Sequence, residues 1–337
     1  MADIRIPFEK IYSTLYRILT ISGFFHEKAK EIARIHTESS RDGIYSHGLN
    51  RFPLFIEYVQ KGVVKMDVEP ELVQSVGAIE RWDGKYGSGV WNAMKSTDRA
   101  ISIAKKEGIG LVALRNTNHW MRGGTYGWQA AEKGCIFIGF TNTIANMPPW
   151  GGTENRIGNN PMVIAMPRSP KHIVLDMSLS QFSFGKIESY KNDNQMLPFP
   201  GGWNEKGELT KNPEEIEKTM KGLPVGYWKG SALAIVLDML ATVLSNGYST
   251  AKISSEPLET GLSQVFICVD PGRLNTSSIY ESLLSEIENF VHHVPRDPES
   301  KATYYPGERT YKTRQENTQK GIPVNKEVWS RIQSMIT

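Results

Sequence analysis

Cysteine is scarce in this chain of 337 residues, and its two cysteines do not form a CxxC pair. Cys135 and Cys268 both lie in apolar, strand-like segments, so we expect buried free thiols in a reducing compartment. Long apolar runs are also missing, since no stretch approaches the roughly 18 apolar residues of a membrane-spanning helix. The first ten residues lack the apolar core and cleavage site of a signal peptide. These absences predict a cytoplasmic protein without a membrane partner.

The chain has little excess charge of either sign, because 39 basic side chains face 36 acidic ones and the net charge is +3. A dedicated nucleic-acid binder would show a basic stripe, so we expect no nucleic-acid partner. The seven histidines show no HExxH motif or paired-ligand spacing, and neither a GxSxG nor a Walker motif is present. We therefore expect no metal site. With 39% hydrophobic and 22% charged residues, the composition indicates a soluble globular protein of one to three domains.

Helical and strand-like patterns alternate along most of the chain, which predicts an α/β fold with helices from both chain ends beside it. Apolar residues at helical spacing predict helices over Phe8–Ser22, His26–Ser40, about Asn50–Gln60, Val90–Glu107, Tyr126–Lys133, Ser231–Leu244, Ser277–Val291 and Lys326–Met335. Shorter apolar segments predict strands within Leu72–Trp82 and over Leu111–Leu114, Cys135–Phe140, Met162–Met166, His172–Leu175 and Val265–Val269.

Other segments carry expectations of their own. Ser231–Leu244 is apolar nearly all round, so we expect this helix to be central, with Ser231 as its N-cap. Lys191–Gly222 is charged and rich in Pro, Gly and Asn, which predicts a long excursion on the surface. Lys301–Thr318 is polar and is assigned no helix. We expect His36 to be a packed or surface histidine rather than a catalytic one.

The run from Gly108 to Ala113 reads G-x-G-x-x-A and mimics a dinucleotide-binding fingerprint. That fingerprint must follow a strand and open a helix. Here the predicted order is reversed, because the run follows a helix and opens a strand. We therefore reject a Rossmann fingerprint at this position.

The stretch from Tyr45 to Pro53 concentrates polar chemistry just before a predicted helix, in whose first turn Pro53 is well tolerated. His47 lies before the helix N-terminus, a position that favours anions. It can pass a proton to a carbonyl oxygen, and Arg51, four residues later, can hold a neighbouring carboxylate by two parallel bonds. The alternative is an ordinary loop with a capping serine and a surface arginine.

The position of His47 opposes the charged form that a proton donor needs. A helix N-terminus lowers the pKa of a histidine, yet a proton donor must be charged. An anionic substrate, or an acidic neighbour that the sequence does not identify, has to compensate.

His119 is the second histidine of interest, because it directly follows a predicted strand in a loop with Gly123 and Gly124. Loops at the carboxyl ends of strands bind ligands in α/β proteins, and glycines allow close backbone approach. The alternative is a loop histidine bonded to its own backbone. The sequence leaves open whether His47 or His119 is the proton donor.

Two further segments contain residues that suit a cofactor, and a third does not stand out on its own. The strand from His172 ends in a carboxylate at Asp176, which suits ribose hydroxyls, although an Asp cap is the alternative. Lys229 and the free amides of the helix capped by Ser231 predict a phosphate site. Gly307-Glu308-Arg309 on its own reads as a solvated turn.

Several of these runs resemble a known family. Ser46-His47-Gly48 followed by Asn50-Arg51-Phe52 resembles the signature of the malate/L-lactate/L-sulfolactate dehydrogenase superfamily, whose cofactor fold is not a Rossmann fold. Within it, the bacterial 2,3-diketo-L-gulonate reductases are similar to this chain from about Phe8 to Ile336. The runs that carry this likeness are Gly108–Asn116, Asn118–Gly124, Met147–Gly151 and Gly226–Ser231.

The resemblance implies an α/β fold with a non-Rossmann, mixed-sheet NAD(P)-binding domain and a helical domain built from both chain ends. The helical domain is expected over 1–70 plus about 295–337, and the α/β core over about 71–294, with the cofactor region at about 116–270. The implied activity is NAD(P)H-dependent reduction of a 2-keto sugar acid by a homodimer, with 2,3-diketo-L-gulonate as the expected substrate. The alternatives are a dehydrogenase of malate, lactate, sulfolactate or ureidoglycolate, and a sugar-acid binding protein without turnover.

The resemblance also implies roles for single residues. Some members of the superfamily are assigned proton transfer at the histidine that matches His119, whereas the diketogulonate reductases are usually assigned the one that matches His47. The implied substrate-binding residues are Ser46, Arg51 and Asn118. The implied cofactor-binding residues, for NAD(H) or NADP(H), are His172, Ile173, Val174, Leu175, Asp176, Met177, Ser178, Trp228, Lys229, Gly307, Glu308 and Arg309.

Overall fold

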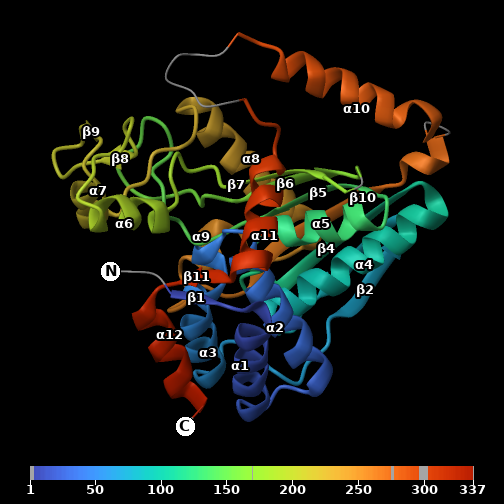
Figure 1. Cartoon of the computed structure of the whole chain (residues 1–337), viewed down its shortest axis with the longest axis horizontal. Helices are drawn as coiled ribbons and strands as arrows, with labels where there is room; N and C mark the ends of the chain where they lie inside the picture. The colour runs from blue at the N-terminus through green and yellow to red at the C-terminus, as the bar shows by residue number, and fades with distance from the viewer. Residues whose placement is uncertain (1–3, 169, 275–276, 296–302, 337) are drawn as a thin grey trace.

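A seven-stranded mixed sheet forms the centre of the computed structural model, which describes residues 4–168, 170–274, 277–295 and 303–336 (Figure 1). The strands run in the order β2-β3-β4-β10-β5-β6-β7, and only β3 and β4 are parallel among these neighbours. This sheet therefore differs from the parallel sheet of a Rossmann domain, as expected. Its strands are β2 (Glu71–Val76), β3 (Ile79–Asp83), β4 (Ile109–Thr117), β10 (Leu262–Val269), β5 (Ile136–Thr141), β6 (Met162–Met166) and β7 (Ile173–Met177).

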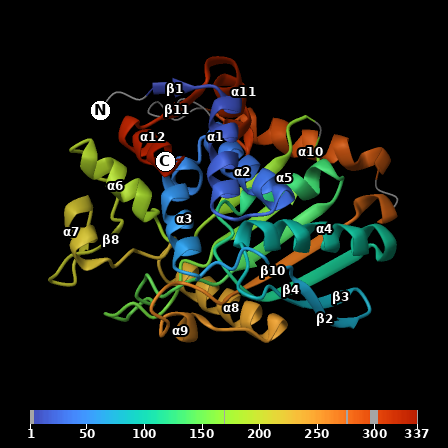
Figure 2. The same cartoon turned by 90° about the horizontal axis from the view of Figure 1, so that it is seen from below.

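Helices cover both faces of this sheet (Figure 2). On one face α4 (Gly89–Glu107) packs on β4 and β10, and α5 (Gly124–Glu132) packs on β5, β6 and β7. On the other face α8 (Trp228–Ser245) packs on β10, β4 and β5. The helix α4 ends at Glu107 and β4 begins at Ile109, so the G-x-G-x-x-A run does lie between a helix and a strand.

A helical layer built from both chain ends packs beside α4 and α5. Its N-terminal part is α1 (Phe8–Ile21), α2 (His26–Arg41), the 3-10 turns η1 (Tyr45–His47) and η2 (Leu49–Arg51), and α3 (Phe52–Gln60). Its C-terminal part is α11 (Glu308–Lys320), α12 (Lys326–Gln333) and the 3-10 turn η4 (Ser334–Ile336). The strand β1 (Ile4–Ile6) pairs antiparallel with β11 (Ile322–Val324), and so joins the two parts. The division of the chain into domains remains a prediction, and 1–3, 296–302 and 337 lie outside the described residues.

The segment Lys191–Gly222, which we expected to be a long excursion on the surface, belongs to a small folded unit. It contains α6 (Phe184–Asn192), β8 (Gly202–Trp203), β9 (Leu209–Thr210) and α7 (Pro213–Thr219). Ile187, Leu197 and Ile216 form an apolar core of its own. Near the beginning of α6, a Cβ atom at Gly185 would lie 3.3 Å from Cβ of Ser46. This unit therefore reaches the turn that carries His47.

The expectation of a central Ser231–Leu244 helix is wrong, because α8 is buried on one side only. Ala234, Leu237 and Ala241 are buried, whereas Met239 and Val243 are 60% and 72% exposed. An apolar pattern all round a helix shows what the helix can bury, and here only the sheet-facing side is covered. Among the described residues, α8 is the helix long and apolar enough to cross a membrane by length and composition, with 33% of that window buried.

The N-cap predicted at Ser231 is also wrong. The helix α8 begins at Trp228, after Tyr227 in a positive-φ conformation (58°). Ser231 lies inside the first turns and its Oγ accepts a hydrogen bond from the Trp150 amide at 2.9 Å. The serine thus joins two sequence runs that are far apart in the chain.

Several other boundaries differ from the predicted ones. The helix predicted from about Asn50 begins at Phe52, with Pro53 in its first turn, because two 3-10 turns precede it. The strand β7 continues through Met177, so Asp176 lies within it. The polar segment assigned no helix contains α11, whose few buried residues hide its periodicity, and 301–302 lie outside the described residues. The remaining described elements are α9 (Thr250–Ile253), η3 (Pro271–Leu274) and α10 (Ser277–His292).

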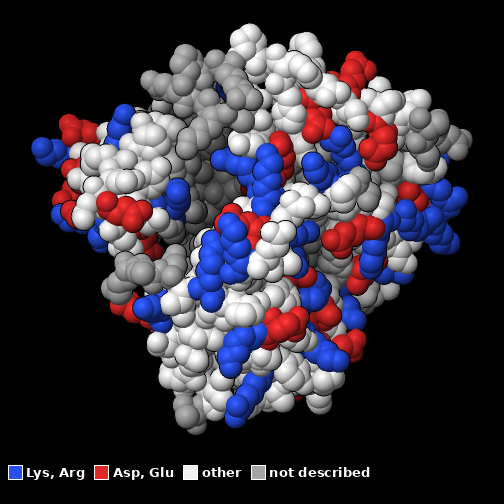
Figure 3. All heavy atoms as spheres, viewed as in Figure 1, with Lys and Arg blue, Asp and Glu red and all other residues white. Residues whose placement is uncertain are grey.

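The prediction of two buried cysteines is confirmed. Cys135 and Cys268 are both buried free thiols, and burial raises the pKa of each. On the face drawn in Figure 3, lysine and arginine side chains are interspersed with aspartate and glutamate side chains. Neither positive nor negative side chains dominate that face.

Candidate active site

The turn that carries His47 is held against α2 by close backbone contacts. A Cβ atom at Gly48 would lie 2.1 Å from Oγ of Ser40, so only glycine fits there. The Ser40 Oγ accepts a hydrogen bond from the Leu49 amide at 2.8 Å. The two short turns η1 and η2 are thereby fixed on the helical layer.

His36 supports the same turn from inside α2 and is a packed histidine, as expected. Its ring is fully buried and packs against Phe52 and Phe55. Burial lowers the pKa of His36 to about 4, so the ring is neutral. Its Nδ1 then donates to the Gly48 carbonyl at 3.2 Å. His36 is therefore a positioning residue for the turn.

His47 faces a cavity of about 260 Å³ that His119 also lines. The Nδ1 atom of His47 lies 2.9 Å from Oγ of Ser46, and this hydrogen bond fixes the ring orientation. The two imidazole rings are stacked with their centroids 5.8 Å apart. With Nδ1 engaged, Nε2 of His47 is the atom left to exchange a proton with a ligand.

The charge of His47 depends on its neighbours. Burial lowers its pKa, Asp176 raises it, and Arg51 and Arg122 lower it further. The carboxylate of Asp176 is thus the acidic neighbour that a charged His47 requires and that the sequence does not identify. A nearby negative charge favours the imidazolium form.

Asp176 is itself held at the beginning of α5. Its Oδ2 accepts a hydrogen bond from the Gly124 amide at 2.8 Å, and Nε of Arg122 lies 3.9 Å from the same oxygen. A Cβ atom at Gly124 would lie 2.7 Å from Oδ2, so glycine allows this approach. A helix N-terminus and a guanidinium both favour a carboxylate.

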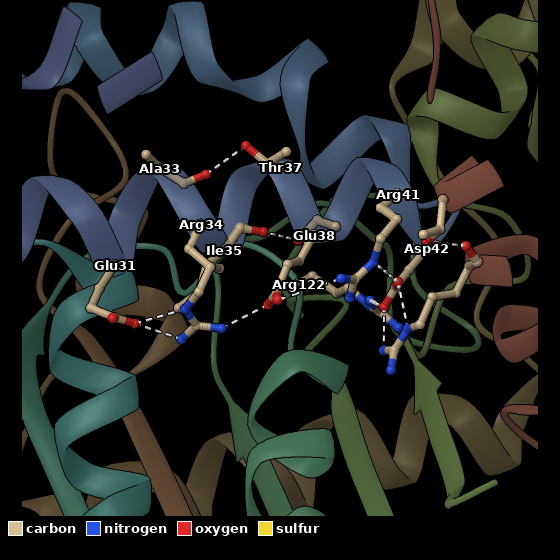
Figure 4. A network of polar contacts seen from close by, with 12 residues as sticks. Glu31, Ala33, Arg34, Ile35, Thr37, Glu38, Arg41, Asp42 and Arg122 are labelled. Carbon is tan, nitrogen blue, oxygen red and sulfur yellow. Dashed lines mark hydrogen bonds and ion pairs between the residues drawn. The ribbon is translucent and has the colours of Figure 1, made fainter. Parts of the chain in front are cut away.

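Arg122 is anchored by a buried network centred on Asp42 (Figure 4). Asp42 accepts from Arg122 at 2.5 Å and from Arg314 at 2.8 and 2.6 Å, and Arg41 lies 3.1 Å away. Although burial alone would raise it, these guanidinium groups lower the pKa of Asp42 to about 2. The network joins α2, the loop before α5, and α11.

His119 has the opposite electrostatic setting. Its Nδ1 accepts a hydrogen bond from the Met121 amide at 2.9 Å, so the neutral ring carries its proton on Nε2. Burial, Arg51 and His47 all hold the pKa of His119 well below its usual range. His119 is therefore bonded to the backbone of its own loop through Nδ1, as in the alternative considered above. Its Nε2 remains a hydrogen-bond donor.

Arg51 lies on the far side of His119, at a second cavity of about 20 Å³. Its guanidinium forms no hydrogen bond or ion pair with any residue that the structure describes. Tyr58, Asn118 and Glu259 also line this cavity. Since roughly 10–15 Å³ holds one water, the space suits a single small polar group.

The carboxamide of Asn118 is already used within the protein. Its Nδ2 donates to the carbonyls of Val63, Tyr86 and Gly87, and its Oδ1 accepts from Thr260. These bonds fix the loop that begins with His119. A direct substrate contact for this side chain remains a prediction, and the structure shows it as scaffold.

Two of the three predicted cofactor segments meet at β7 and the third begins near its end, but only part of them reaches the larger cavity. Asp176 and Ser178 line it. Gly307 lies beside the beginning of β7, where a Cβ atom would be 3.0 Å from the His172 carbonyl, and Val174 donates to Pro306 at 3.0 Å. The segment that leads to Trp228 lies beside the end of β7, since Val225 donates to Leu179 at 2.8 Å.

The other predicted cofactor residues lie outside that cavity. Trp228 and Lys229 are exposed in the first turn of α8, with Nζ of Lys229 5.8 Å from the Trp228 ring. Arg309 packs on Tyr304, and Glu308 pairs with Lys312. His172 accepts from the Arg168 amide and packs against Trp128. Ile173, Val174, Leu175 and Met177 are the strand residues between these points.

Three residues of the site were missed from the sequence. Arg122 gave no signal apart from lying in the same loop as His119. Glu259 and Asn159 come from loops far from both histidines in the chain, and only the fold brings them to the cavities. Among the described residues, no group of three or more His, Cys, Asp or Glu side chains is placed to hold a metal ion.

Comparisons with known proteins place the chain in a family. A model of the malate/L-lactate dehydrogenase family matches residues 6–333. A 2,3-diketo-L-gulonate reductase of Salmonella paratyphi B is 45% identical over 332 residues, which are 98% of this chain and 100% of the relative. Malate dehydrogenase of Pyrococcus horikoshii has a TM-score of 0.90 at 27% identity, covering 99% of this chain and 94% of that one. Sulfolactate dehydrogenase of Methanocaldococcus jannaschii has a TM-score of 0.87 at 25% identity, covering 98% and 96%.

Proposed function

Since this chain belongs to the malate/L-lactate dehydrogenase family and is therefore an oxidoreductase, we propose that it reduces a 2-keto sugar acid, 2,3-diketo-L-gulonate, with NADH or NADPH. The observation that carries the substrate is the 45% identity, over nearly the whole chain, to a relative of that name. The site supports it with a proton-exchanging histidine at one cavity and, at the neighbouring cavity that His119 also lines, an arginine without an ion-pair partner among the described residues. A reducible carbonyl next to a carboxylate fits these two groups.

His47 is the proton donor in this proposal. When bound, the nicotinamide cofactor supplies the hydride that reaches the carbonyl carbon. Nε2 of His47 gives its proton to the carbonyl oxygen and is left neutral, to be protonated again from solvent. Asp176 supports this role because it favours the charged ring before transfer. His119 suits a different task, since its neutral Nε2 can donate a hydrogen bond that orients the carbonyl.

Arg51 holds the substrate carboxylate. Its free guanidinium can form two parallel bonds to a carboxylate, which fixes the direction of the adjoining carbonyl. The cavity at Arg51 admits one small polar group, and the larger cavity beyond His119 has room for the rest of the substrate and a ring. Ser46 contributes by orienting His47 rather than by a contact of its own.

The residues along β7 fit a nicotinamide dinucleotide. Asp176 of β7 and Ser178, just after the strand, line the larger cavity. The side chain of Lys229 is exposed in the first turn of α8 and can pair with a phosphate, with the exposed Trp228 as an apolar surface beside it. The roles of His172, Gly307, Glu308 and Arg309 in holding the remaining parts rest on the family resemblance. Nothing in these residues selects NADH over NADPH.

The assembly that we propose is a cytoplasmic homodimer. The uncovered apolar side of α8 supports it, because a face of this kind on a globular enzyme is typically covered by a partner. The exposed Ile279, Leu283 and Ile287 of α10 offer a second apolar surface. A helical domain from both chain ends beside an α/β core remains our proposed division of the chain.

The test is a turnover assay with 2,3-diketo-L-gulonate and either NADH or NADPH, followed at the nicotinamide absorbance band. We expect absorbance to fall only when the keto acid is present. Arg51→Lys should lose most of this activity, since lysine keeps the charge but not the paired geometry. A sugar-acid binding protein would bind the acid and leave the absorbance unchanged, which would contradict the proposal.

A further inference from the structure

Glu259 shares the smaller cavity with the arginine that we propose as the carboxylate-binding residue. It lies in the loop between α9 and β10 and lines this cavity together with Arg51, Tyr58 and His119. One of its oxygens, Oε1, accepts a hydrogen bond from the Ile144 amide at 3.1 Å. The carboxyl group is thus anchored on one side, next to the space that a ligand would enter.

The other oxygen of Glu259, Oε2, is available to a ligand. It forms no hydrogen bond or ion pair with any residue that the structure describes. Burial raises the pKa of Glu259, while the Ile144 amide and the charge of Arg51 oppose this. Arg51 is therefore near enough to act on the carboxyl group, although the two side chains do not form an ion pair in the described structure.

A substrate carboxylate at Arg51 brings two carboxyl groups into one small space. The cavity of about 20 Å³ has room for one small polar group, which in the proposed function is this carboxylate. A charged Glu259 already balances Arg51, and His119 adds no second positive charge, because its Nδ1 accepts from the Met121 amide. When two carboxyl groups share such a site, they do not both stay ionised, and one of them keeps a proton.

We propose that Glu259 is protonated when the keto acid is bound, and that it donates a hydrogen bond from Oε2 to the carboxylate held by Arg51. The inference rests on the proposed function, which places that carboxylate at Arg51. Where Glu259 is charged in the free enzyme, the proton comes from solvent on binding and returns to solvent on release. Glu259 is thus a substrate-binding residue, and His47 still protonates the carbonyl oxygen. A hydrogen bond to a charged acceptor is among the stronger ones in proteins.

The other groups at the site leave two side chains that can change charge when a keto acid binds. The guanidinium of Arg51 stays charged, and burial raises the pKa of Tyr58, so its phenol stays neutral. The pKa of His119 is held well below its usual range, first by burial. His47 at the larger cavity can take up a proton, as can Glu259. A variant of Glu259 separates these two contributions.

The test measures the binding of oxamate, a keto-acid analogue with one carboxylate next to a carbonyl that does not accept a hydride. Calorimetry with NADH present, in buffers of different ionisation enthalpy and over a pH series, gives the affinity and the protons taken up. As Glu259 becomes charged in the free wild type, we expect the affinity to fall by up to about tenfold per pH unit more than in Glu259→Gln, with up to about one more proton taken up.

Glu259→Gln suits this comparison because glutamine imitates the protonated acid. Its amide oxygen can accept from the Ile144 amide, and its N–H group can donate to the carboxylate. The variant should therefore bind oxamate at least as tightly as the wild type at alkaline pH. Glu256→Gln is the matched control, because Glu256 lies in the same loop but pairs with Lys252 at 3.0 Å outside both cavities. It should follow the wild type.

The outcomes separate this inference from the proposed function. Equal pH dependence and proton uptake in the wild type and Glu259→Gln, or weaker binding in Glu259→Gln at every pH, would overturn it. A wild-type affinity that does not change over the series would overturn it without any variant, and so would a failure of oxamate to bind. The turnover assay reports on the proposed function independently. If 2,3-diketo-L-gulonate is not reduced but oxamate binding shows the extra proton, the proposed function fails and the role of Glu259 stands.

Discussion

At the scale of single residues, the two histidines of the site differ because of the atoms around them. Nδ1 of His119 accepts from a backbone amide, so a second proton on that ring would oppose an N–H group. Nδ1 of His47 meets a hydroxyl, which can donate or accept, and Asp176 favours the charged ring. One ring is therefore confined to the neutral form, while the other can change charge.

Replacing the proton donor should remove most of the turnover. We expect His47→Ala to lower kcat by about 10²- to 10⁴-fold, the usual worth of general acid catalysis, and to leave cofactor affinity unchanged. His119→Gln keeps a neutral donor and should lose far less. Steady-state kinetics with a keto acid check both. If His47→Ala keeps wild-type kcat while the His119 variant loses it, the two roles have to be exchanged.

Removing the acidic neighbour of His47 should move the pH profile. Reduction needs the charged ring, so its rate falls as the pH rises through the pKa of His47. Asp176 raises that pKa, and Asp176→Asn should lower it, so the fall should begin at a lower pH than in the wild type. The kcat profile at saturating cofactor is the measurement. A fall that moves to higher pH, or that does not move, would contradict the pairing.

At the scale of elements, local patterns predicted most helices and strands because periodicity is a property of neighbouring residues. The helix that follows the His47 turn, the long helix before Ile109 and the strands of the sheet were found in this way. The effect of Asp176 on the pKa of His47 was not found, because only the packing of the whole chain brings these two residues to one cavity. The uncovered side of α8 was missed for a related reason, since hydropathy does not say which surface a helix meets.

The beginning of α8 should matter for the cofactor alone. We expect Lys229→Ala to weaken binding of NADH about tenfold or more and to leave the KM of the keto acid nearly unchanged, since a phosphate at a helix start loses a positive charge. Lys206→Ala, an exposed lysine beside the β8–β9 turn, is the control. Fluorescence titration with NADH measures both. Unchanged affinity in Lys229→Ala would remove the phosphate site.

The network at Asp42 should stabilise the fold in a pH-dependent way. Asp42→Asn leaves buried guanidinium groups unpaired and should lower the free energy of unfolding at neutral pH by about 3–5 kcal/mol. The pKa of Asp42 falls to about 2 on folding, so the stability from its charge is complete above its ordinary pKa of 3.8 and is lost as the pH falls towards 2.

Urea unfolding at several pH values checks this expectation. Asp98→Asn is the control, because Asp98 pairs with Lys133 at the surface and should cost under about 1 kcal/mol. A difference between Asp42→Asn and the wild type that persists undiminished near pH 2 would show that the charge is not the cause.

At the scale of the whole molecule, the apolar surface is distributed unevenly. The helical layer and the inner faces of α4 and α5 share one large core with the sheet. The outer side of α8 leaves Val236, Met239, Leu240 and Val243 exposed. In the homodimer that we propose, association of two copies would remove this side from water.

A charge placed on that side should prevent association. We expect the wild type to sediment as a dimer and Val243→Asp to sediment as a monomer with an unchanged fold, because a carboxylate cannot be buried unpaired in an apolar contact. Ile21→Asp, on the exposed end of α1, is the matched control and should remain dimeric. Sedimentation velocity measures all three proteins. A dimeric Val243→Asp would place the interface elsewhere.

The pairing of β1 with β11 also sets the order in which the protein can be finished during synthesis. Ile4 and Ile6 emerge from the ribosome long before their partners Val324 and Ile322. At about 5–20 residues per second, on the order of 15–60 s separates the two events. Throughout that time α1 and α2 can pack on each other, but the layer that holds His47 lacks β11 and α12. A nascent chain stalled before residue 322 should therefore carry every residue proposed for proton transfer and still be inactive.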